Sequence, residues 1–532
     1  MLLSLTIRTF VKALLRKRGE IILGVGLLMF SQSLFATDYT SINPGNWNDP
    51  MVWTPNGIPG AGDNVTISAG HIITLTNIQS CKNLIINGTL QIQWSDFTVN
   101  ETTTVNGTLI DNNVNGIDRF YGVITVNPGA VWNTYAVNSS SRIQIWNSII
   151  NNTDTMRFSA ARIYANMSIN GTGVLSAYNL NFESDGLIVT NKSNVLIKLN
   201  LNALNRSSTW KNDIGSVLTY EGSQLLMNSN GTLIASDANN TVIYQGGDQQ
   251  VKTPLGLAYY NLVISGSGTK TLQNYTIITN NLTINNTATL LCNQYQITGT
   301  PTGHLTMTGG TTLRIGNPSV ATGNTFPTGF TTTNISLDPA STVIYQANTS
   351  QDISNVPVYG NLTTATSGSK IITGNTYVKG NVTIGSNTVL EFNNSNYNLS
   401  VEGNWIHNGV LNENYGTITF TGSNNQTITG NPNETFWNLT IDKSGGIVQP
   451  VNGNTDIFVT NDFRIKSGTF ETGANTLQVS GNSYIAGTLS INDASGSANL
   501  QNTDLSGGTI TGSTATGTAI IAGNLSMPTG NG

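Results

Sequence analysis

The stretch that decides the fold runs from Thr241 to Ile284 and reads TVIYQGGDQQVKTPLGLAYYNLVISGSGTKTLQNYTIITNNLTI. Diverged copies of it run from Thr342 to Ile384 and from Thr417 to Ile465. Each copy opens with an alternating strand that ends in an aromatic residue, contains an Asn-Leu pair, and closes on isoleucine. Repetition of this kind produces stacked units that share one continuous core and do not fold alone.

A glutamine also recurs in each copy, just ahead of an apolar position. We place it at Gln250 before Val251, and the later copies have Gln351 and Gln426. The glutamine is therefore a further element of the repeat.

Short alternating strands separated by tight turns begin before these blocks. The turns at Asn87-Gly88, Asn106-Gly107 and Asn127-Pro128 lie 19 and 21 residues apart. A step of about twenty residues with Asn/Gly corners predicts an all-β fold, a right-handed parallel β-helix (solenoid) in which each strand pairs with its equivalent one coil on. We expect Ile, Val and Leu to stack inward and corner asparagines to form hydrogen-bonded ladders. A string of antiparallel sandwiches is the alternative, because hairpins favour the same turns.

The first 36 residues have the features of a secretion signal. A basic segment that contains Arg16, Lys17 and Arg18 precedes the apolar run 21–30, and a cleavage position follows Ala36. The alternative is an uncleaved membrane anchor, but the apolar run is shorter than the ~20 residues that a spanning helix needs. We therefore predict a secreted, extracellular or outer-surface protein with no transmembrane span after cleavage.

Charge is sparse, and it excludes some partners. Charged residues make up 9% of the chain. Without residues 1–36 the chain has 17 Lys or Arg and 26 Asp or Glu, a net charge of −9. Because nucleic-acid phosphates need clustered Lys and Arg, we expect no nucleic-acid partner. Cys81 and Cys292 are too far apart in a rod for a disulfide, and we expect inert buried thiols.

Residues 37–75 form a separate opening segment that contains NPGNWNDPMVWTPNGIPGAGDNVTISAGHIITL, from Asn43 to Leu75. The first coil of a solenoid would otherwise leave its core and strand edges bare. We therefore predict an N-terminal cap in which Trp47 and Trp53 plug the core, and Asp63 and His71 have structural roles.

This segment resembles the opening motif of large secreted β-helix surface proteins of the Bacteroidota, and its second half is similar to the start of the eight-glycine extracellular domain. The Tyr-x-Asn-Leu-Thr-Ile repeats resemble those of the same proteins. The resemblance implies export, often by the type IX route, and an adhesin-like role. Because such proteins usually end in a sorting domain, we interpret this chain as a fragment of a longer protein, truncated at its C-terminus.

The predicted organisation is therefore a signal peptide (1–36), a cap (37–75), a first β-helix region (76–240), and a region (241–532) with the blocks 241–284, 342–384 and 417–465. No complete set of catalytic groups stands out. Asn454-Thr455-Asp456 and Arg464-Ile465-Lys466 match parts of a pectin-hydrolase pattern, but Asp-Asp and Gly-His-Gly are missing. Glu391, Glu402 and Glu413 recur every eleven residues and are expected to be solvated, and the three histidines lack metal-ligand spacing. We predict no enzyme activity, no cofactor and no metal.

Aromatic residues are the candidate binding groups. They recur at one place in the blocks and are Tyr259, Tyr260, Tyr359, Phe436 and Trp437. Exposed rings would stack on sugars, and the alternative is that they pack inside the solenoid. The predicted function is a non-catalytic structural or adhesion protein that contacts surface glycans or other cell-surface proteins through its flanks. The alternatives are a polysaccharide lyase or hydrolase whose active part is degenerate or missing, and a sugar-binding module.

Overall fold

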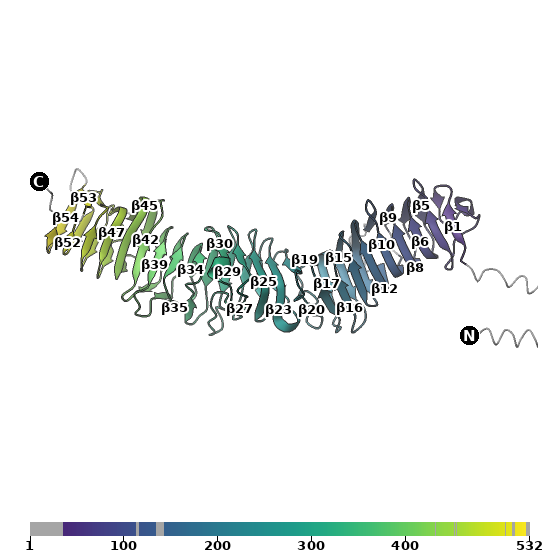
Figure 1. Cartoon of the computed structure of the whole chain (residues 1–532), viewed down its shortest axis with the longest axis horizontal. Helices are drawn as coiled ribbons and strands as arrows, with labels where there is room; N and C mark the ends of the chain where they lie inside the picture. Colours follow the sequence, from purple (N-terminus) through teal and green to yellow (C-terminus); the bar gives the residue numbers. More distant parts are fainter. Residues whose placement is uncertain are drawn as a thin grey trace, which may run out of the picture.

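The structure, a computed structural model, describes residues 36–112, 116–134, 143–430, 432–451, 453, 455–505, 507–512 and 517–527. It is a parallel β-solenoid of about 21 turns, with 54% of the residues in strands and 2% in helices. Figure 1 shows an elongated, gently bowed rod whose strands lie across its long axis. The all-β parallel prediction is confirmed, and the antiparallel-sandwich alternative is wrong. The predicted signal peptide lies outside the described residues, apart from Ala36.

The N-terminal half of the rod is one 26-stranded sheet that wraps around the coils. The strands of the first flank are β4 (Asn64–Ile67), β6 (Gln79–Ile86), β8 (Phe97–Val105), β10 (Asp118–Val126), β12 (Ile143–Asn152), β14 (Met167–Asn170), β16 (Ile188–Asn191), β18 (Thr209–Asn212) and β20 (Thr232–Ile234). Those of the second flank are β5 (Ile72–Leu75), β7 (Thr89–Ile92), β9 (Thr108–Asp111), β11 (Val131–Thr134), β13 (Thr155–Ile163), β15 (Val174–Phe182), β17 (Asn194–Asn202), β19 (Val217–Tyr220) and β21 (Thr241–Tyr244). The long strands bend at a corner, so that their other halves form a third flank.

The same sheet includes strands at both of its ends. They are β1 (Asp38–Ser41), β2 (Gly45–Asn46), β3 (Trp53–Thr54), β23 (Ala258–Ile264), β25 (Thr276–Ile284), β27 (Ile297–Thr298), β28 (Leu305–Met307) and β30 (Ile335–Leu337). Three short 3₁₀ helices interrupt the coils: η1 (Pro50–Val52), η2 (Leu255–Leu257) and η3 (Thr332–Asn334).

The C-terminal half contains three further parallel sheets. The 20-stranded sheet comprises β22 (Gln249–Val251), β24 (Thr269–Leu272), β26 (Thr289–Leu291), β29 (Thr312–Ile315), β31 (Thr342–Tyr345), β33 (Val358–Tyr359), β34 (Asn361–Thr364), β36 (Thr376–Val378), β37 (Val382–Ile384), β39 (Asn398–Val401), β40 (Trp405–His407), β42 (Thr417–Phe420), β43 (Gln426–Thr429), β45 (Asn438–Pro450), β47 (Phe463–Glu471), β49 (Ser483–Ile485), β50 (Thr488–Ile491), β52 (Thr503–Asp504), β53 (Thr509–Gly512) and β55 (Leu525–Ser526). The four-stranded sheet comprises β32 (Gln351–Ile353), β35 (Gly368–Ile372), β38 (Thr388–Glu391) and β41 (Val410–Asn412). The five-stranded sheet comprises β44 (Glu434–Phe436), β46 (Ile457–Val459), β48 (Thr476–Val479), β51 (Ser497–Leu500) and β54 (Thr518–Ile521).

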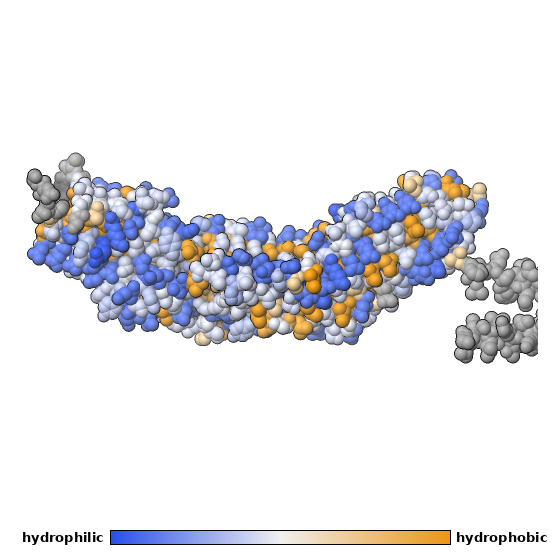
Figure 2. Space-filling view, viewed as in Figure 1, coloured by the Kyte–Doolittle hydropathy of each residue, from blue (hydrophilic) through white to orange (hydrophobic). Residues whose placement is uncertain are grey.

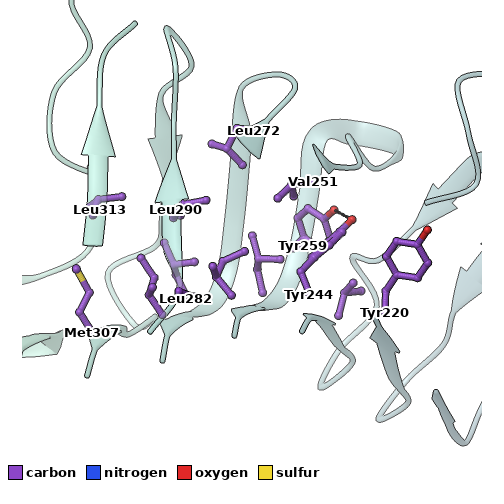
Figure 3. Close-up of a cluster of buried hydrophobic side chains, with 14 of the residues drawn as sticks. Tyr220, Tyr244, Val251, Tyr259, Leu272, Leu282, Leu290, Met307 and Leu313 are labelled. Carbon is purple, nitrogen blue, oxygen red and sulfur yellow. Dashed lines mark hydrogen bonds between the residues drawn. The ribbon is translucent and has the colours of Figure 1, made fainter. Parts of the chain in front are cut away.

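Alternating strand sequences place every second side chain in the interior, where equivalent positions stack from coil to coil. Val242, Leu262, Leu282 and Leu305 are successive register partners, and all four are buried. Figure 3 shows such rows of side chains between Tyr220 and Leu313. The buried apolar side chains form one connected core from Trp47 to Leu500. Burial of each such side chain contributes roughly 1.5–3 kcal/mol, so stability accumulates coil by coil.

Corner asparagines form the predicted ladder. The Asn106 side-chain amide donates to Asn87 Oδ1 at 2.7 Å, and that of Asn127 donates to Asn106 Oδ1 at 2.6 Å. The glycine after the asparagine allows the coils to approach closely at this corner. A Cβ at Gly107 would lie 2.1 Å from the carbonyl oxygen of Gly88. The Asn-Gly dipeptide is therefore required by the contact between coils as well as by the turn.

The recurring glutamine is an internal clamp, but in the first block it is Gln249 and not Gln250. Gln249, Gln351 and Gln426 are buried, whereas Gln250 points outward. In Gln351, Oε1 accepts from Ala347 N at 2.8 Å, and Nε2 donates to the carbonyls of Ile315 and Asn324 at 3.2 and 3.0 Å. The side chain thereby binds backbone groups of a preceding coil as well as of its own.

A buried lysine accompanies the glutamine in every block. Lys270, Lys370 and Lys443 are nearly or fully buried. Lys370 Nζ donates to the carbonyls of Ala347, Thr349 and Ser367 at 2.9, 3.0 and 2.6 Å. Burial lowers the pKa of Lys370 to about 8, so the ammonium still has its proton at neutral pH. Its three N–H groups donate to three carbonyls at a corner, where strand pairing provides no donor for them.

Lys370→Met is expected to lower the free energy of unfolding by about 3 kcal/mol, because the carbonyls around Nζ lose their donor inside the protein. Urea denaturation followed by circular dichroism measures this loss. Lys379→Met is the matched control, since Lys379 is exposed and its loss should change stability by less than about 0.5 kcal/mol. Equal effects of the two substitutions would contradict the role of Lys370 as a buried hydrogen-bond donor.

The predicted cap residues lie in the first two coils. Trp47 and Trp53 are buried, their rings pack edge to face at 5.2 Å, and Trp53 Nε1 donates to the Trp47 carbonyl at 2.9 Å. Asp63 accepts from the backbone of Thr37 and Gly60 at 3.1 and 2.9 Å. His71 Nδ1 and Ser41 Oγ are 2.9 Å apart. All four residues therefore have structural contacts, while the capping role itself stays a prediction.

The thiols agree with the prediction. Cys81 and Cys292 are free and buried, and burial raises the pKa of Cys292 to about 12. A thiol in this state is neutral and a poor nucleophile.

Candidate binding groove

The aromatic residues predicted to bind sugars are mostly in the core. Tyr259, Tyr359 and Phe436 each have 0% of their surface exposed. A buried ring offers no face to a ligand, so the binding prediction is wrong for these three. They recur because they pack inside the solenoid, the alternative that the sequence left open.

Two of these rings belong to hydroxyl pairs inside the core. The hydroxyls of Tyr244 and Tyr259 are 3.2 Å apart, as the dashed line in Figure 3 shows, and those of Tyr345 and Tyr359 are 2.7 Å apart. Tyr359 also donates to the Ser354 carbonyl at 2.7 Å. The third block has phenylalanine at both places, Phe420 and Phe436. Loss of both hydroxyls together leaves neither one buried without a partner.

Tyr260 and Trp437 differ from the other three, because both are half-buried. The Trp437 ring packs edge to face against Tyr415 at 5.2 Å. These two residues lie on different blocks, and no described contact joins them. Their role in binding stays a prediction.

Phe436→Ala is expected to destabilise the protein by about 3–5 kcal/mol, the usual loss for a large ring removed from a core. Trp437→Ala should destabilise it by less, because the indole is partly exposed. Thermal and urea unfolding of both variants tests this order. A Phe436→Ala variant as stable as the parent would contradict the assignment of this ring to the core.

A groove on the second flank brings together residues that the sequence did not single out. It lies over β11, β13, β15 and β17, towards the N-terminal side of the middle of the rod in Figure 1, and has a volume of about 610 Å³. Its lining consists of Asn133, Thr134, Thr155, Arg157, Phe158, Val174, Ser176, Tyr178, Leu196 and Lys198. Since the lining strands are successive coils, the groove runs along the rod axis.

Parallel register fixes the positions of these side chains. Arg157 pairs with Asn133 on one side and with Ser176 on the other, and Ser176 pairs with Leu196. Inward neighbours such as Phe158 are buried and hold the strands in place. Tyr178 and Lys198 follow at the bend of β15 and β17, where Lys198 Nζ lies 5.4 Å from the centre of the Tyr178 ring.

No ion pair in the described part of the chain neutralises the positive charge of the groove. Other basic side chains in the N-terminal half form ion pairs: Arg119 with Asp96 at 3.0 Å, and Lys211 with Asp237 at 3.0 Å. Within the described ranges, neither Arg157 nor Lys198 has an ion-pair partner, and no lining residue is acidic. Both cations are therefore free to meet an anionic ligand. Tyr178, 41% exposed, adds a ring that a ligand can reach.

A second aromatic group on the surface is less suited to binding. Tyr121, Trp146 and Tyr164 form a stack at one corner, with ring centres 5.7 and 4.2 Å apart. Trp146 and Tyr164 are within 5° of parallel. Because each ring covers the face of the next, the interior of the stack offers no free face to a sugar. The stack resembles the core rows and stabilises the corner.

Two buried carboxyl groups are the other unusual chemical feature. Glu413 was expected to be solvated, and that prediction is wrong, because Glu413 is 5% exposed and Glu434 is fully buried. Glu434 Oε2 lies 2.8 Å from His407 Nδ1, and Glu413 Oε1 accepts from the backbone N–H of Trp437. Glu434 lies on β44, and Glu413 follows β41. Paired carboxyls can serve acid–base chemistry, but at this depth a polysaccharide cannot reach them.

Burial raises the pKa of both carboxyls. For Glu413 the neighbouring Glu434 adds to the effect of burial, whereas for Glu434 the hydrogen bond with His407 opposes it. Raised values mean that the folded protein favours the protonated acids. In the unfolded chain the same groups ionise near their ordinary value of 4.5.

The pH dependence follows from this difference. Below the ordinary value both states hold the proton, and above it the unfolded chain ionises first, so the stabilising contribution is lost as pH rises through the folded pKa. The melting temperature should therefore fall as pH rises above the ordinary carboxyl value of 4.5, and Glu413→Gln should weaken this fall. Glu101→Gln is the control, because Glu101 lies at the surface. An unchanged pH profile in Glu413→Gln would contradict the raised pKa.

One signal in the sequence could have located the groove. Arg157, Tyr178 and Lys198 lie 21 and 20 residues apart, which is the coil step itself. Basic and aromatic residues at intervals of about one coil are that signal. The aromatic residues that recur within the repeat blocks are instead mostly core residues. No comparable signal marked Glu434, since only the fold brings it next to His407.

Comparison with known proteins adds no assignment, because no family model, no curated protein and no solved structure matches this chain. Among the described residues, no group of three or more His, Cys, Asp or Glu side chains has the geometry of a metal site. None of the helices in that part of the chain is long and apolar enough to cross a membrane.

Proposed function

We propose that this chain is a non-catalytic secreted or cell-surface protein that binds surface glycans or other cell-surface proteins through the flank of its solenoid. The observation that carries the proposal is the groove over β11, β13, β15 and β17. It combines the cations of Arg157 and Lys198, the accessible ring of Tyr178 and hydroxyl groups on a rigid surface. Residues 1–36 have the composition of a secretion signal, which supports export.

The architecture supports a role in display rather than in conformational change. Each coil is bonded to its neighbours along all its strands, so the flank positions are fixed relative to one another. The face drawn in Figure 2 is largely hydrophilic, with apolar groups gathered in patches. The resemblance to β-helix surface proteins of the Bacteroidota supports an adhesin-like role and export by the type IX route.

A carbohydrate-active enzyme is the second candidate. The groove supports it in one respect, since Arg157, Tyr178 and Lys198 could neutralise an acidic sugar and move a proton. The lining lacks a carboxylate, and the buried pair Glu413 and Glu434 lies out of reach. Both features favour binding without turnover.

The secreted form, residues 37–532, is expected to bind at least one member of a panel of polysaccharides without cleaving it. Pull-down measures binding, while reducing ends and the absorbance of unsaturated uronates measure hydrolysis and elimination. Turnover of any glycan would overturn the non-catalytic proposal. No binding to glycans or to purified cell-surface proteins would overturn the adhesion proposal.

A further inference from the structure

We infer that the groove over β11–β17 is a binding site for an acidic polysaccharide, and that Arg157 and Lys198 bind carboxylates of its hexuronate units. This inference rests on the proposed function and specifies its ligand class. It depends on the charge, spacing and exposure of three side chains from three successive coils.

The charge of the groove is the first argument. The secreted chain has a net charge of −9, so a polyanion is repelled by most of its surface and needs a local cationic site. Arg157 and Lys198 provide one, since both lack acidic partners in the described part of the chain. A guanidinium binds a carboxylate through two parallel hydrogen bonds, and an ammonium acts as a point charge.

The spacing is the second argument. Arg157 and Lys198 lie on coils two steps apart, which separates their backbones by about 10 Å. Four lining strands along the axis give the groove a length of roughly 15 Å. A linear polymer with a charge on each unit can therefore meet both cations at once, whereas a single small anion can meet only one of them.

The surface between the cations is the third argument. Tyr178 lies on the coil between them and is accessible, and aromatic rings stack on the C–H faces of sugars. Val174 and Leu196 add apolar floor, while Thr155 and Ser176 supply hydroxyls for sugar hydrogen bonds. This alternation of apolar and polar groups suits a pyranose ring.

A nucleic acid fits the groove less well. Affinity for a nucleic acid grows with the number of phosphates that Lys and Arg neutralise, and the groove has two cations. The rings of Tyr121, Trp146 and Tyr164 stack on one another, so the faces between them are not open to bases. The observations therefore favour the acidic sugar.

The test compares ligands that differ only in charge. The probes are short oligogalacturonate, the same oligosaccharide as its methyl ester, and oligoalginate, titrated into residues 37–532 by calorimetry. We expect one or both of the acidic forms to bind, and the methyl ester to bind about tenfold more weakly or worse, because the ester has no negative charge to pair with Arg157 and Lys198. Binding should also weaken as salt is raised.

The variants locate the site. The double variant Arg157→Gln/Lys198→Gln should lose about tenfold or more in affinity, the loss expected of charge-assisted hydrogen bonds. Lys379→Gln/Lys466→Gln removes the same charge at exposed positions elsewhere and should bind like the parent. Tyr178→Ala should weaken binding, and Tyr178→Phe should retain it. Unchanged melting temperatures show that each variant is folded.

Three results with the oligosaccharides and the variants would overturn the inference. They are failure of both acidic oligosaccharides to bind, equal affinity for the acid and its ester, and parental affinity in Arg157→Gln/Lys198→Gln. Single-stranded DNA that binds as tightly as the uronates would also overturn it, because the groove would then be a general polyanion site. If the panel described above finds a neutral glycan or a protein partner while the uronates fail, the proposed function stands and only this inference falls.

Discussion

Backbone hydrogen bonding between coils is the interaction on which the whole structure depends. Strands along the rod find their partners about twenty residues away, one coil before and one coil after, and only the opening strands β1 and β3 form a named antiparallel pair in the described part of the chain. Parallel register therefore requires that successive coils have nearly the same path, because a shift of one residue would turn inward side chains to the surface. Inserted residues must therefore project from the corners between strands. This leaves the flanks as regular surfaces.

The interior has to accommodate polar groups that this arrangement creates. Corners carry carbonyls and N–H groups that no strand satisfies, and they lie against the core. The buried Gln351 and Lys370 bind them directly, and Tyr345 and Tyr359 do so through paired hydroxyls. The long repeat blocks are thus explained by the requirements of the corner rather than by ligand binding. A motif can recur in a solenoid because equivalent corners have the same unpaired backbone groups, and the same side chains can bind them.

Function in such a protein depends on what the outward positions carry. Three successive coils place Arg157, Tyr178 and Lys198 on one flank without a loop or a helix to hold them. Arg157 is in register with Ser176, two residues before Tyr178, so the three groups follow the rod axis with a sideways step. The rigid frame fixes their spacing before a ligand arrives, which reduces the entropy lost on binding. A polymer with a regular repeat is the natural ligand for such a linear array.

Composition and repetition in the sequence were enough to determine the fold class. The Asn-Gly turns, the step of about twenty residues and the alternating strands gave the parallel solenoid, its asparagine ladder and the buried thiols. These patterns were sufficient because each one is local in the sequence and has the same structural consequence in every coil. The opening segment also identified Trp47 and Trp53 as residues of the first coil. The sequence placed the clamp in the first block at Gln250, one residue from the buried Gln249, because alternation by itself does not say which of two adjacent glutamines points inward.

The tertiary structure alone decided which aromatic residues are accessible and which charges are free. Tyr259 and Tyr178 are both tyrosines in strands, and only the packing of the coils shows that one is in the core and the other on the flank. Glu413 has the spacing of a solvated residue, yet the coil that contains Glu434 covers it. Arg157 and Lys198 are separated by forty residues of sequence that include other basic side chains with acidic partners. Such distinctions depend on neighbours from other coils, since burial and charge pairing are properties of groups close in space and not of groups close in sequence.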